Sequence, residues 1–475
     1  MGSISNVELY DLISLGSGEA GKYLAWTEGS KGKRCAVIER QWLGGSCPNV
    51  ACLPSKNVIH SAKVLHSKSA QLEEGYSEKG QLGVKASMLA VKRRKGDMIN
   101  GLMELHNGNF EKNGVDVIWG DGKFVGPKEI EVSDATGRKR VIRGDVVIVC
   151  TGSRAKIADI PGLQEAEPLT HVELLDLEAV PDHLIMIGGG YIGLEFAQAM
   201  NRLGAKVTVL EHNARILKRE DEDVAALLEQ ILTREGVNSM TQASITSVSG
   251  RSGEKVMLKC TRDGQPLELD GSHILCATGR LPNNENIGLD VAGISLTQSG
   301  HIKVDEWNRA TDDGVFAVGD CAGSPHFTHV AFDDFRIVRD YLSGKADTNM
   351  PRRSSRQVPF TLFTDPEFAH VGLREHEARA QNIPYRIAKA PLAAFLKTRT
   401  IGATQGFAKV LIAKNSDLIL GFSAIGAGAG ELLPVVQLTM KKNLPYTDIA
   451  DLIITHPTLS EGLSGLFGSV PAKSG

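Results

Sequence analysis

The fold of this chain is decided by the stretch Leu9-Tyr10-Asp11-Leu12-Ile13-Ser14-Leu15-Gly16-Ser17-Gly18-Glu19-Ala20-Gly21. Its first half is apolar and predicts a buried β-strand, and its three glycines then open a helix that we expect to run through Trp26. A second apolar run, Cys35-Ala36-Val37-Ile38, predicts a strand that ends at Glu39. In this order the glycines admit a pyrophosphate to a helix N-terminus, and the carboxylate binds ribose hydroxyls. The stretch therefore predicts a dinucleotide-binding unit.

The same pattern returns at an offset of 172 positions. The predicted strand Leu184-Ile185-Met186-Ile187 leads into Gly188-Gly189-Gly190-Tyr191-Ile192-Gly193, and the later strand Val207-Thr208-Val209-Leu210 ends at Glu211. A glycine-rich turn without a ligand does not repeat its strand, helix and carboxylate at one offset. We therefore infer two dinucleotide folds that bind two different dinucleotides.

The second nucleotide is more consistent with NAD than with NADP, because Glu211 would bind ribose hydroxyls and repel a 2′-phosphate. Lys206, His212 and Arg215 are nearby cations that could offset this repulsion. NADP therefore stays open as an alternative.

Two cysteines, five positions apart, lie in Gly44-Gly45-Ser46-Cys47-Pro48-Asn49-Val50-Ala51-Cys52-Leu53-Pro54-Ser55-Lys56. Residues at this spacing in an α-helix have Cα atoms roughly 8 to 9 Å apart, beyond the ~7 Å limit for a disulfide. If the two bond, we expect Cys47 in an irregular turn and Cys52 at or inside the next helix, whose N-terminus lowers the pKa of a thiol. An isolated pair at this spacing is more often two separate buried thiols. The flanking nucleotide motifs favour a redox-active disulfide instead.

The composition is that of a globular protein of about three domains, with 475 residues of which 42% are hydrophobic. The 53 basic and 56 acidic residues give a formal net charge of -3, and no basic block or acidic tail points to nucleic acid or a membrane surface. No signal peptide and no run of ~20 apolar residues is found. We expect a soluble, cytoplasmic protein that acts on a small molecule. The other cysteines lie singly and are interpreted as packing residues: Cys35, Cys150, Cys260, Cys276 and Cys321.

Three further strands end in small or acidic residues. Cys150-Thr151-Gly152-Ser153-Arg154 and Ala277-Thr278-Gly279-Arg280-Leu281-Pro282-Asn283 each follow an apolar run and predict a tight crossover between domains. Gly314-Val315-Phe316-Ala317-Val318-Gly319-Asp320 predicts a buried strand whose final carboxylate could meet the polyol hydroxyls of a cofactor.

Taken in order, these features resemble the class I flavoprotein disulfide reductases, a pyridine nucleotide-disulfide oxidoreductase family that includes dihydrolipoamide dehydrogenase, glutathione reductase and mercuric reductase. The resemblance covers nearly the whole chain and includes His456-Pro457-Thr458-Leu459-Ser460-Glu461 near its end. Phe327-Thr328-His329-Val330-Ala331-Phe332-Asp333-Asp334-Phe335-Arg336-Ile337 and Leu444-Pro445-Tyr446 are most similar to the reactive-chlorine-resistance branch and its mercuric-reductase-like neighbours.

The resemblance implies a role for each matching residue. FAD would lie on Gly16, Gly18, Gly21, Glu39 and Asp320, and the nicotinamide nucleotide on Gly188, Gly190, Gly193 and Glu211. Thr151, Gly152, Gly279 and Lys56 are also assigned to cofactor binding, and no residue is assigned to a metal. Lys56 and Glu195 would form an ion pair beside the flavin N5.

The implied reaction carries electrons from NAD(P)H through FAD to the Cys47–Cys52 bridge. Cys47 would attack the substrate, Cys52 would face the flavin, and His456, oriented by Glu461, would hold the proton. The chain departs from the commonest family pattern at Glu19, Pro48 and Ala51. Glu19 would have to point away from a pyrophosphate, and the other two leave the identity of the substrate open.

Three functions compete. The first is an NADH-dependent reductase of a disulfide or other oxidised sulfur compound, and the second is a reductase of Cu(II) or Hg(II). The last ten residues lack the paired cysteines of mercuric reductases and no N-terminal metal-binding domain is found, so Cu(II) is favoured over Hg(II). The third is a non-catalytic dimeric scaffold, against which the complete cysteine, His456–Glu461 and nucleotide motifs argue.

We expect an α/β protein with two Rossmann-like domains, for FAD and NAD, and a C-terminal α+β dimerisation domain. The expected bounds are residues 1–153 for the FAD domain, 154–281 for the NAD(P) domain, 282–350 for a return to the first sheet and 351–475 for the interface domain. In the last, Ala408-Lys409-Val410-Leu411-Ile412-Ala413 and Leu418-Ile419-Leu420-Gly421 predict antiparallel strands. The resemblance implies a homodimer whose active sites each combine Cys47 and Cys52 of one subunit with His456 of the other.

Overall fold

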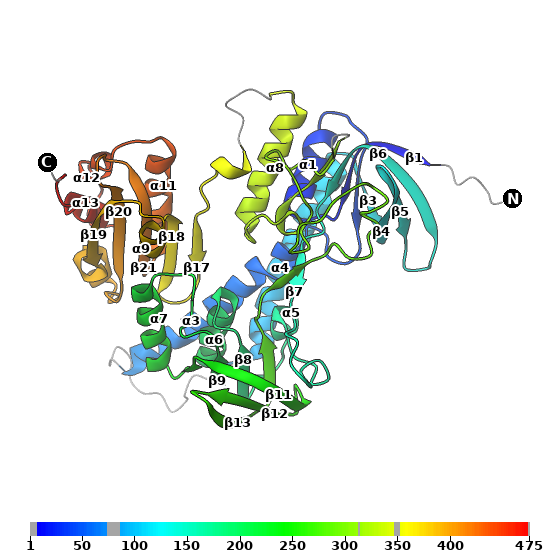
Figure 1. Ribbon diagram of the computed structural model, residues 1–475. Coiled ribbons are helices and arrows are strands. Elements are labelled where there is room, and N and C mark those ends of the chain that lie inside the picture. The colour runs from blue at the N-terminus through cyan, green and yellow to red at the C-terminus, as the bar shows by residue number, and fades with distance from the viewer. Residues whose placement is uncertain (1–6, 74–85, 312–313, 346–351, 474–475) are drawn as a thin grey trace.

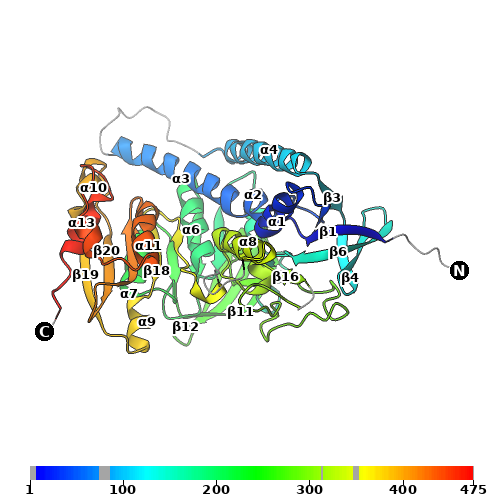
Figure 2. The same ribbon diagram turned by 90° about the horizontal axis from the view of Figure 1, so that it is seen from above.

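The computed structural model describes residues 7–73, 86–311, 314–345 and 352–473 (Figure 1). Over these ranges the chain forms two units built on parallel sheets and a third built on an antiparallel sheet, so the expected α/β fold is confirmed. The first strand and the last helix lie at opposite ends of an elongated molecule (Figure 2). The boundary expected between residues 350 and 351 lies outside the described residues.

The first unit has a seven-stranded sheet whose path runs β3-β2-β1-β6-β5-β4, with β16 also paired to β6. The pairs β3–β2, β2–β1, β1–β6 and β6–β16 are parallel, as in a doubly wound fold, whereas β4 and β5 add antiparallel strands. The strands are β1 (Glu8–Leu15), β2 (Cys35–Glu39), β3 (Val115–Trp119), β4 (Asp121–Gly126), β5 (Glu129–Ser133), β6 (Lys139–Val149) and β16 (Val315–Ala317). Its helices are α1 (Glu19–Gly29), α2 (Ser46–Asn49), α3 (Cys52–Glu73), α4 (Met88–Lys112) and α8 (Thr328–Leu342).

The predicted strands at the start of the chain are confirmed, but the first helix is longer than expected and ends at Gly29 instead of Trp26. Strand β2 is fully buried, because helices α1, α4 and α8 pack against one face and strands β4 and β5 with the segment 289–302 pack against the other. Helices α3 and α4 lie along one long edge of the molecule (Figure 2).

The second unit has a four-stranded parallel sheet of order β10-β9-β8-β14 and a three-stranded antiparallel sheet of order β11-β12-β13. Its strands are β8 (His183–Ile187), β9 (Lys206–Leu210), β10 (Asn238–Met240), β11 (Ala243–Arg251), β12 (Lys255–Arg262), β13 (Gln265–Gly271) and β14 (His273–Cys276). Its helices are α5 (His171–Leu174), α6 (Tyr191–Leu203) and α7 (Glu222–Arg234). The repeat of strand, glycine loop, helix and strand seen in the sequence therefore forms a second fold of the same kind.

The two Thr-Gly crossovers lie side by side. Strand β7 (Ser153–Ala155) follows the first crossover, strand β15 (Arg280–Pro282) follows the second, and the two pair antiparallel. The chain thus enters and leaves the second unit through one two-stranded stem.

The third unit has a five-stranded antiparallel sheet of order β17-β18-β21-β20-β19. The strands are β17 (Phe360–Leu362), β18 (Glu367–Gly372), β19 (Tyr385–Pro391), β20 (Phe407–Ala413) and β21 (Ile419–Gly426). The helices are α9 (Glu375–Ala380), α10 (Leu396–Thr400), α11 (Leu433–Lys441), α12 (Thr447–Ala450) and α13 (Glu461–Gly468). The predicted antiparallel pair corresponds to β20 and β21, but β20 is buried on both faces rather than one, so that even Lys409 is inaccessible.

Candidate active site

The first glycine loop joins β1 to α1 and is shaped by contacts that only glycine permits. Gly16 has φ of 99°, a conformation that L side chains rarely adopt. A Cβ on Gly18 would come 2.9 Å from Cys150 Sγ, and a Cβ on Gly21 would strike Ser14. These three positions therefore require glycine, and the loop leaves the N-terminus of α1 open to a phosphate.

Glu39 lies where the sequence predicts, at the end of β2. Its Oε1 accepts hydrogen bonds from the backbone amides of Arg40, Gln41 and Trp42 at 2.9, 2.9 and 3.1 Å. Its Oε2 accepts from the amide and hydroxyl of Ser17 in the glycine loop. These hydrogen bonds hold the glycine loop in place. They also keep the Glu39 carboxylate at the end of β2, where it is expected to bind ribose hydroxyls.

Glu19 of the glycine loop forms an ion pair with a buried lysine, and its expected direction away from a pyrophosphate stays a prediction. Its Oε2 lies 2.8 Å from Lys22 Nζ, and the Lys22 side chain is only 4% exposed. Lys22 also donates to the Gly44 carbonyl at 3.3 Å. The ion pair neutralises the carboxylate beside the loop, which explains how Glu19 is tolerated there.

The second glycine loop, between β8 and α6, repeats this geometry. Gly188 has φ of 111°, and a Cβ there would come 2.5 Å from the Ala277 carbonyl oxygen. A Cβ on Gly193 would strike the Gly188 carbonyl, which identifies it as the glycine of close helix–strand packing. Around Gly190 no atom of the described residues lies within 4 Å of the Cβ position, so this glycine faces open space.

Glu211 at the end of β9 is held much as Glu39 is. Its Oε2 accepts from the Gly189 amide at 2.8 Å, and its Oε1 accepts from the Asn213 amide at 2.8 Å. His212 Nδ1 lies 3.1 Å from the same carboxylate. Arg215 is turned into its own loop, where it donates to the Glu220 carbonyl at 2.8 Å.

The crossover residues and Asp320 meet at the stem. Gly152 and Gly279 both have positive φ, of 66° and 123°, and leave open space where a Cβ would be. Asp320 accepts a hydrogen bond from Ser153 and lies 3.8 Å from Arg280 Nε. Thr151, next to Gly152, lines the same cavity as Asp320.

The two cysteines lie on either side of a break between α2 and α3. Cys47 is inside the one-turn helix α2 and not in an irregular turn, whereas Cys52 is the first residue of α3, as expected. Val50, with φ of -140°, ends α2 and prevents a continuous helix. Pro48 occupies the third position of α2, where its missing N–H costs nothing because first-turn amides have no helical partner. Both thiols are free.

Glycines also bring the cysteine segment against the first nucleotide loop. Gly45, the residue before α2, has φ of 83°, and a Cβ there would come 2.7 Å from Gly18 Cα. No larger residue allows this approach. The cysteine pair is therefore built directly onto the first glycine loop.

The surroundings of the two cysteines shift their pKa values in opposite directions. A hydrogen bond from Cys47 lowers the pKa of Cys52; burial opposes this effect, while Thr328 and Lys56 reinforce it. The hydrogen bond to Cys52, together with burial, raises the pKa of Cys47. Thr328 Oγ1 lies 3.1 Å from Cys52 Sγ. The pair therefore favours a thiolate on Cys52 and a thiol on Cys47.

The expected ion pair between Lys56 and Glu195 is present, with Nζ 2.7 Å from Oε2. Lys56 lies one turn after Cys52 on α3, and Glu195 lies on α6, which starts at the second glycine loop. The other oxygen of Glu195 accepts from the Phe363 amide at 2.8 Å, and Lys56 Nζ lies 4.7 Å from the centre of the Phe363 ring. All three units of the chain meet at this pair.

One cavity of about 4210 Å³ connects these groups, well above the roughly 300–1,000 Å³ of a single small-molecule site. The predicted site residues that line it are Gly16, Gly18, Glu39, Cys47, Cys52, Lys56, Thr151, Gly152, Gly188, Gly190, Glu195, Glu211, Gly279 and Asp320. Gly21 and Gly193 lie behind the loops as packing residues. Two open glycine loops that lead to one cysteine pair fit two dinucleotides that meet beside it.

His456 and Glu461 lie elsewhere. His456 Nδ1 is 2.9 and 3.0 Å from the two oxygens of Glu461, and because a carboxylate only accepts, Nδ1 carries the hydrogen and Nε2 is left as the acceptor of the neutral ring. The His456 side chain is 63% exposed. Neither residue is among the described residues that line the cavity of Cys47 and Cys52.

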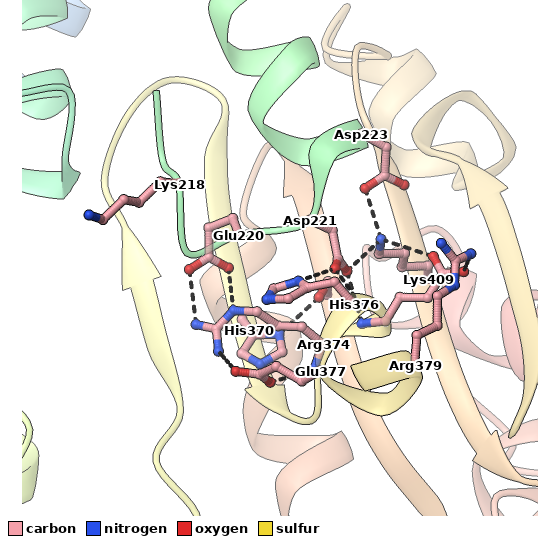
Figure 3. A network of polar contacts seen from close by, with 12 residues as sticks. Lys218, Glu220, Asp221, Asp223, His370, Arg374, His376, Glu377, Arg379 and Lys409 are labelled. Atoms are coloured by element: carbon pink, nitrogen blue, oxygen red, sulfur yellow. Dashed lines mark hydrogen bonds and ion pairs between the residues drawn. The ribbon is translucent and has the colours of Figure 1, made fainter. Parts of the chain in front are cut away.

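A polar network fastens the second unit to the third (Figure 3). Arg374 binds Glu220 through two hydrogen bonds of 2.8 and 2.9 Å, and Glu220 also accepts from the hydroxyl of Tyr191 in the second glycine loop. Beside it, Lys409 of β20 contacts Asp221. The described residues contain no group of three or more His, Cys, Asp or Glu side chains arranged for a metal ion.

Family models match almost the whole chain. That of the pyridine nucleotide-disulphide oxidoreductases matches residues 10–334, and that of their dimerisation domain matches residues 358–466. The chain belongs to the pyridine nucleotide-disulfide oxidoreductase family. No helix in the described ranges is long and apolar enough to cross a membrane.

Individual members of the pyridine nucleotide-disulfide oxidoreductases are similar over their full length. The chain is 31% identical over 465 residues to the probable pyridine nucleotide-disulfide oxidoreductase RclA of Escherichia coli K12, covering 97% of this chain and 99% of RclA. It is 30% identical over 458 residues to the mitochondrial dihydrolipoyl dehydrogenase of Pisum sativum, covering 95% and 90%. The structure matches the Cu(II) complex of E. coli RclA, an HOCl-induced flavoprotein disulfide reductase, with a TM-score of 0.87 at 30% identity over 97% and 99% of the two chains.

These matches identify the protein as a flavoprotein disulfide reductase that uses FAD and a pyridine nucleotide and carries a dimerisation domain. The third unit corresponds to the dimerisation domain, while the assignment of the first unit to FAD and of the second to NAD(P)H stays a prediction. Sequence reasoning missed Thr328, which reaches the site from α8 of the same unit as the cysteines, and the amide of Phe363, which reaches it from the third unit. The available signal for Thr328 was a hydroxyl residue within the stretch Phe327–Ile337 that carries part of the family resemblance, and this residue is the first of α8.

Proposed function

We propose that the protein is an NADH-dependent reductase of a disulfide or other oxidised sulfur compound, with Cys47 as the residue that attacks the substrate. One observation carries the proposal. The cysteine segment packs on the first glycine loop through Gly45, and one turn after Cys52 the side chain of Lys56 reaches Glu195 on the helix of the second loop. A cysteine pair at this junction can receive electrons from one side and give them to a substrate on the other.

FAD, when bound, supplies the two-electron step that carries reducing equivalents from the nicotinamide nucleotide to the cysteine pair. In the reduced pair, Cys47 loses its proton and attacks one sulfur of the substrate disulfide, forming a mixed disulfide and releasing one thiolate. Cys52 then attacks Cys47 Sγ, releasing the second thiolate and restoring the Cys47–Cys52 bond. Two electrons leave the pair, and two protons are needed by the released thiolates.

His456, acting across the dimer, is proposed to take the proton of Cys47 and pass it to one released thiolate, and the second proton comes from solvent. Its neutral ring has Nδ1–H bound to Glu461 and a free Nε2, which suits it to take the proton of Cys47 and return it to a leaving thiolate. Three observations support a site that the second subunit completes. His456 does not line the cavity of the cysteines, its side chain is exposed, and it lies in the dimerisation domain.

The test is a panel of NADH oxidation assays with lipoamide, glutathione disulfide, cystine and Cu(II). We expect turnover with at least one sulfur compound and its loss in Cys47→Ser. A panel in which no sulfur compound is reduced would contradict the proposal.

Reduction of Cu(II) is the second candidate, favoured by the match to an RclA structure solved as a Cu(II) complex. Here the reduced pair would give one electron to each of two Cu(II) ions, forming two Cu(I) ions and the Cys47–Cys52 disulfide. Turnover with Cu(II) but not with any disulfide would select this function.

A further inference from the structure

The N-termini of two helices lie next to each other at Cys52. Cys52 is the first residue of α3, and Thr328, the first residue of the 15-residue helix α8, has its Oγ1 3.1 Å from Cys52 Sγ. The N-terminus of a helix carries a partial positive charge, which favours an anion nearby. The two ends come from segments 276 positions apart, so they converge only in the fold.

The Thr328 hydroxyl has no competing task among the described residues. It does not cap its own helix, since Phe327 is the residue before α8 and no side chain makes the capping hydrogen bond. Its hydrogen-bond partners in the described part of the chain are the two cysteines. A hydroxyl has one hydrogen to donate, and a thiolate is a stronger acceptor than a thiol.

We propose that the Thr328 hydroxyl donates its hydrogen bond to the Cys52 thiolate of the reduced protein, and so selects Cys52 over Cys47 as the sulfur that stays ionised. This inference rests on the proposed function, in which the pair is reduced through FAD. Reduction by two electrons and one proton leaves one thiol and one thiolate on the pair. Thr328 decides which sulfur holds the proton and how strongly the pair reduces a substrate.

The other charges around Cys52 are compatible with this role. Lys56, one turn along α3, favours the thiolate, and Glu195 on α6 opposes it, while the Lys56–Glu195 ion pair leaves their combined effect small. Glu19 of the first glycine loop disfavours a thiolate on Cys47. Thr328 is therefore a neutral donor whose hydrogen bond adds to these charges in favouring the thiolate on Cys52.

The experiment uses FAD-loaded protein reduced by two electrons, in which a thiolate next to the flavin gives a long-wavelength absorbance band. The band is titrated against pH in the wild type, Thr328→Val, Thr328→Ala and Thr328→Ser. Loss of a hydrogen bond to a charged group raises the titration midpoint by about one pH unit, a tenfold weaker ionisation. We expect this rise in the valine and alanine variants and a midpoint near that of the wild type in the serine variant.

Thr246→Val is the matched control, because Thr246 Oγ1 donates to the Lys259 carbonyl on an exposed strand of the second unit. Its midpoint should equal that of the wild type. A normal wild-type band with an unchanged midpoint in both hydroxyl-free variants would overturn this inference alone. A wild type without any band would overturn the proposed function together with it.

Discussion

Lys409 Nζ lies 2.8 Å from Asp221 Oδ2, in an ion pair that joins strand β20 of the dimerisation domain to the start of helix α7 in the second unit (Figure 3). The two side chains are 1% and 7% exposed. Lys409 also lies 2.8 Å from Asp223 Oδ1. A buried ammonium that serves two carboxylates holds the two domains in one orientation.

Lys409→Met should be strongly destabilising, because it removes the ammonium partner of the buried Asp221 carboxylate. We expect the free energy of unfolding to fall by about 3–5 kcal/mol, measured by urea denaturation at fixed protein concentration. Lys389→Met is the matched control: Lys389 contacts Asp223 at 2.7 Å but is 44% exposed. It should cost less than about 1 kcal/mol. Equal losses in the two variants would contradict the role of burial.

The same network predicts sensitivity to acid. Burial alone would raise the pKa of Asp221, but hydrogen bonds from Lys409 and His376 outweigh it and hold the pKa below its ordinary value, and Asp223 is shifted in the same direction. A carboxyl with a depressed folded pKa stabilises the protein above its unfolded value of about 3.9 and loses this contribution as the pH falls through the folded value. The urea concentration at the unfolding midpoint should therefore decrease as the pH falls below about 4. In Lys409→Met this decrease should be smaller. A midpoint whose acid dependence is identical in the variant would count against this assignment.

Single cysteine variants should separate the two sulfurs. In FAD-loaded Cys47→Ser, Cys52 remains and a long-wavelength band is expected at neutral pH, because the surroundings of Cys52 favour its thiolate. In Cys52→Ser the band should be absent. Visible spectra of the two variants across the same pH range make the comparison, and a band that persists without Cys52 would reverse the assignment.

The carboxylate of Glu211 predicts a preference for NADH. It is fixed at the end of β9 by the amides of Gly189 and Asn213, whereas Arg215 is turned into its own loop. The kcat/KM for NADH should exceed that for NADPH, and Glu211→Ser should lower the NADH value by about tenfold through lost hydrogen bonds. Equal wild-type values for the two nucleotides would show that the neighbouring cations dominate.

Mixing two inactive variants tests whether the active site is shared. Cys47→Ser and His456→Ala dimers are combined under conditions that exchange subunits. A mixed dimer then has one site with both lesions and one with wild-type Cys47 and His456. Random exchange makes half of the dimers mixed, so about a quarter of wild-type activity should return. If exchange is verified by mass and no activity returns, the site is built within one chain.

The elements fixed by local pattern were predictable from the sequence. Both glycine loops are read from strand, turn and helix signals within about 30 residues. The Lys56–Glu195 contact also followed, because each residue sits at a short offset from a motif, one after Cys52 and the other after Gly193. The family resemblance predicted that Lys56 and Glu195 form an ion pair, and the packing of α3 against α6 brings the two side chains together.

Contacts set by packing between distant segments were not predictable. Thr328 reaches Cys52 only because α8 and α3 begin at the same point, and Glu195 meets the Phe363 amide only when the third unit is in place. The ion pair of Glu19 was not predictable either, because nothing in the sequence shows that Lys22 is buried beside it. In β20, the apolar run predicts a strand, yet nothing local shows that Lys409 is covered on both sides.

The pairing of β7 with β15 has a consequence for the origin of the electrons. Since Ser153 and Pro282 are register partners, the whole second unit is inserted at a single point of the first unit. Insertions whose ends lie together can be exchanged without disturbing the host domain. With the second unit assigned to the nicotinamide nucleotide, as the sequence predicts, exchange of this one unit is expected to change the electron donor. A lineage could change between NADH and NADPH by recombination at the two Thr-Gly turns, while the cysteines and their substrate stayed the same.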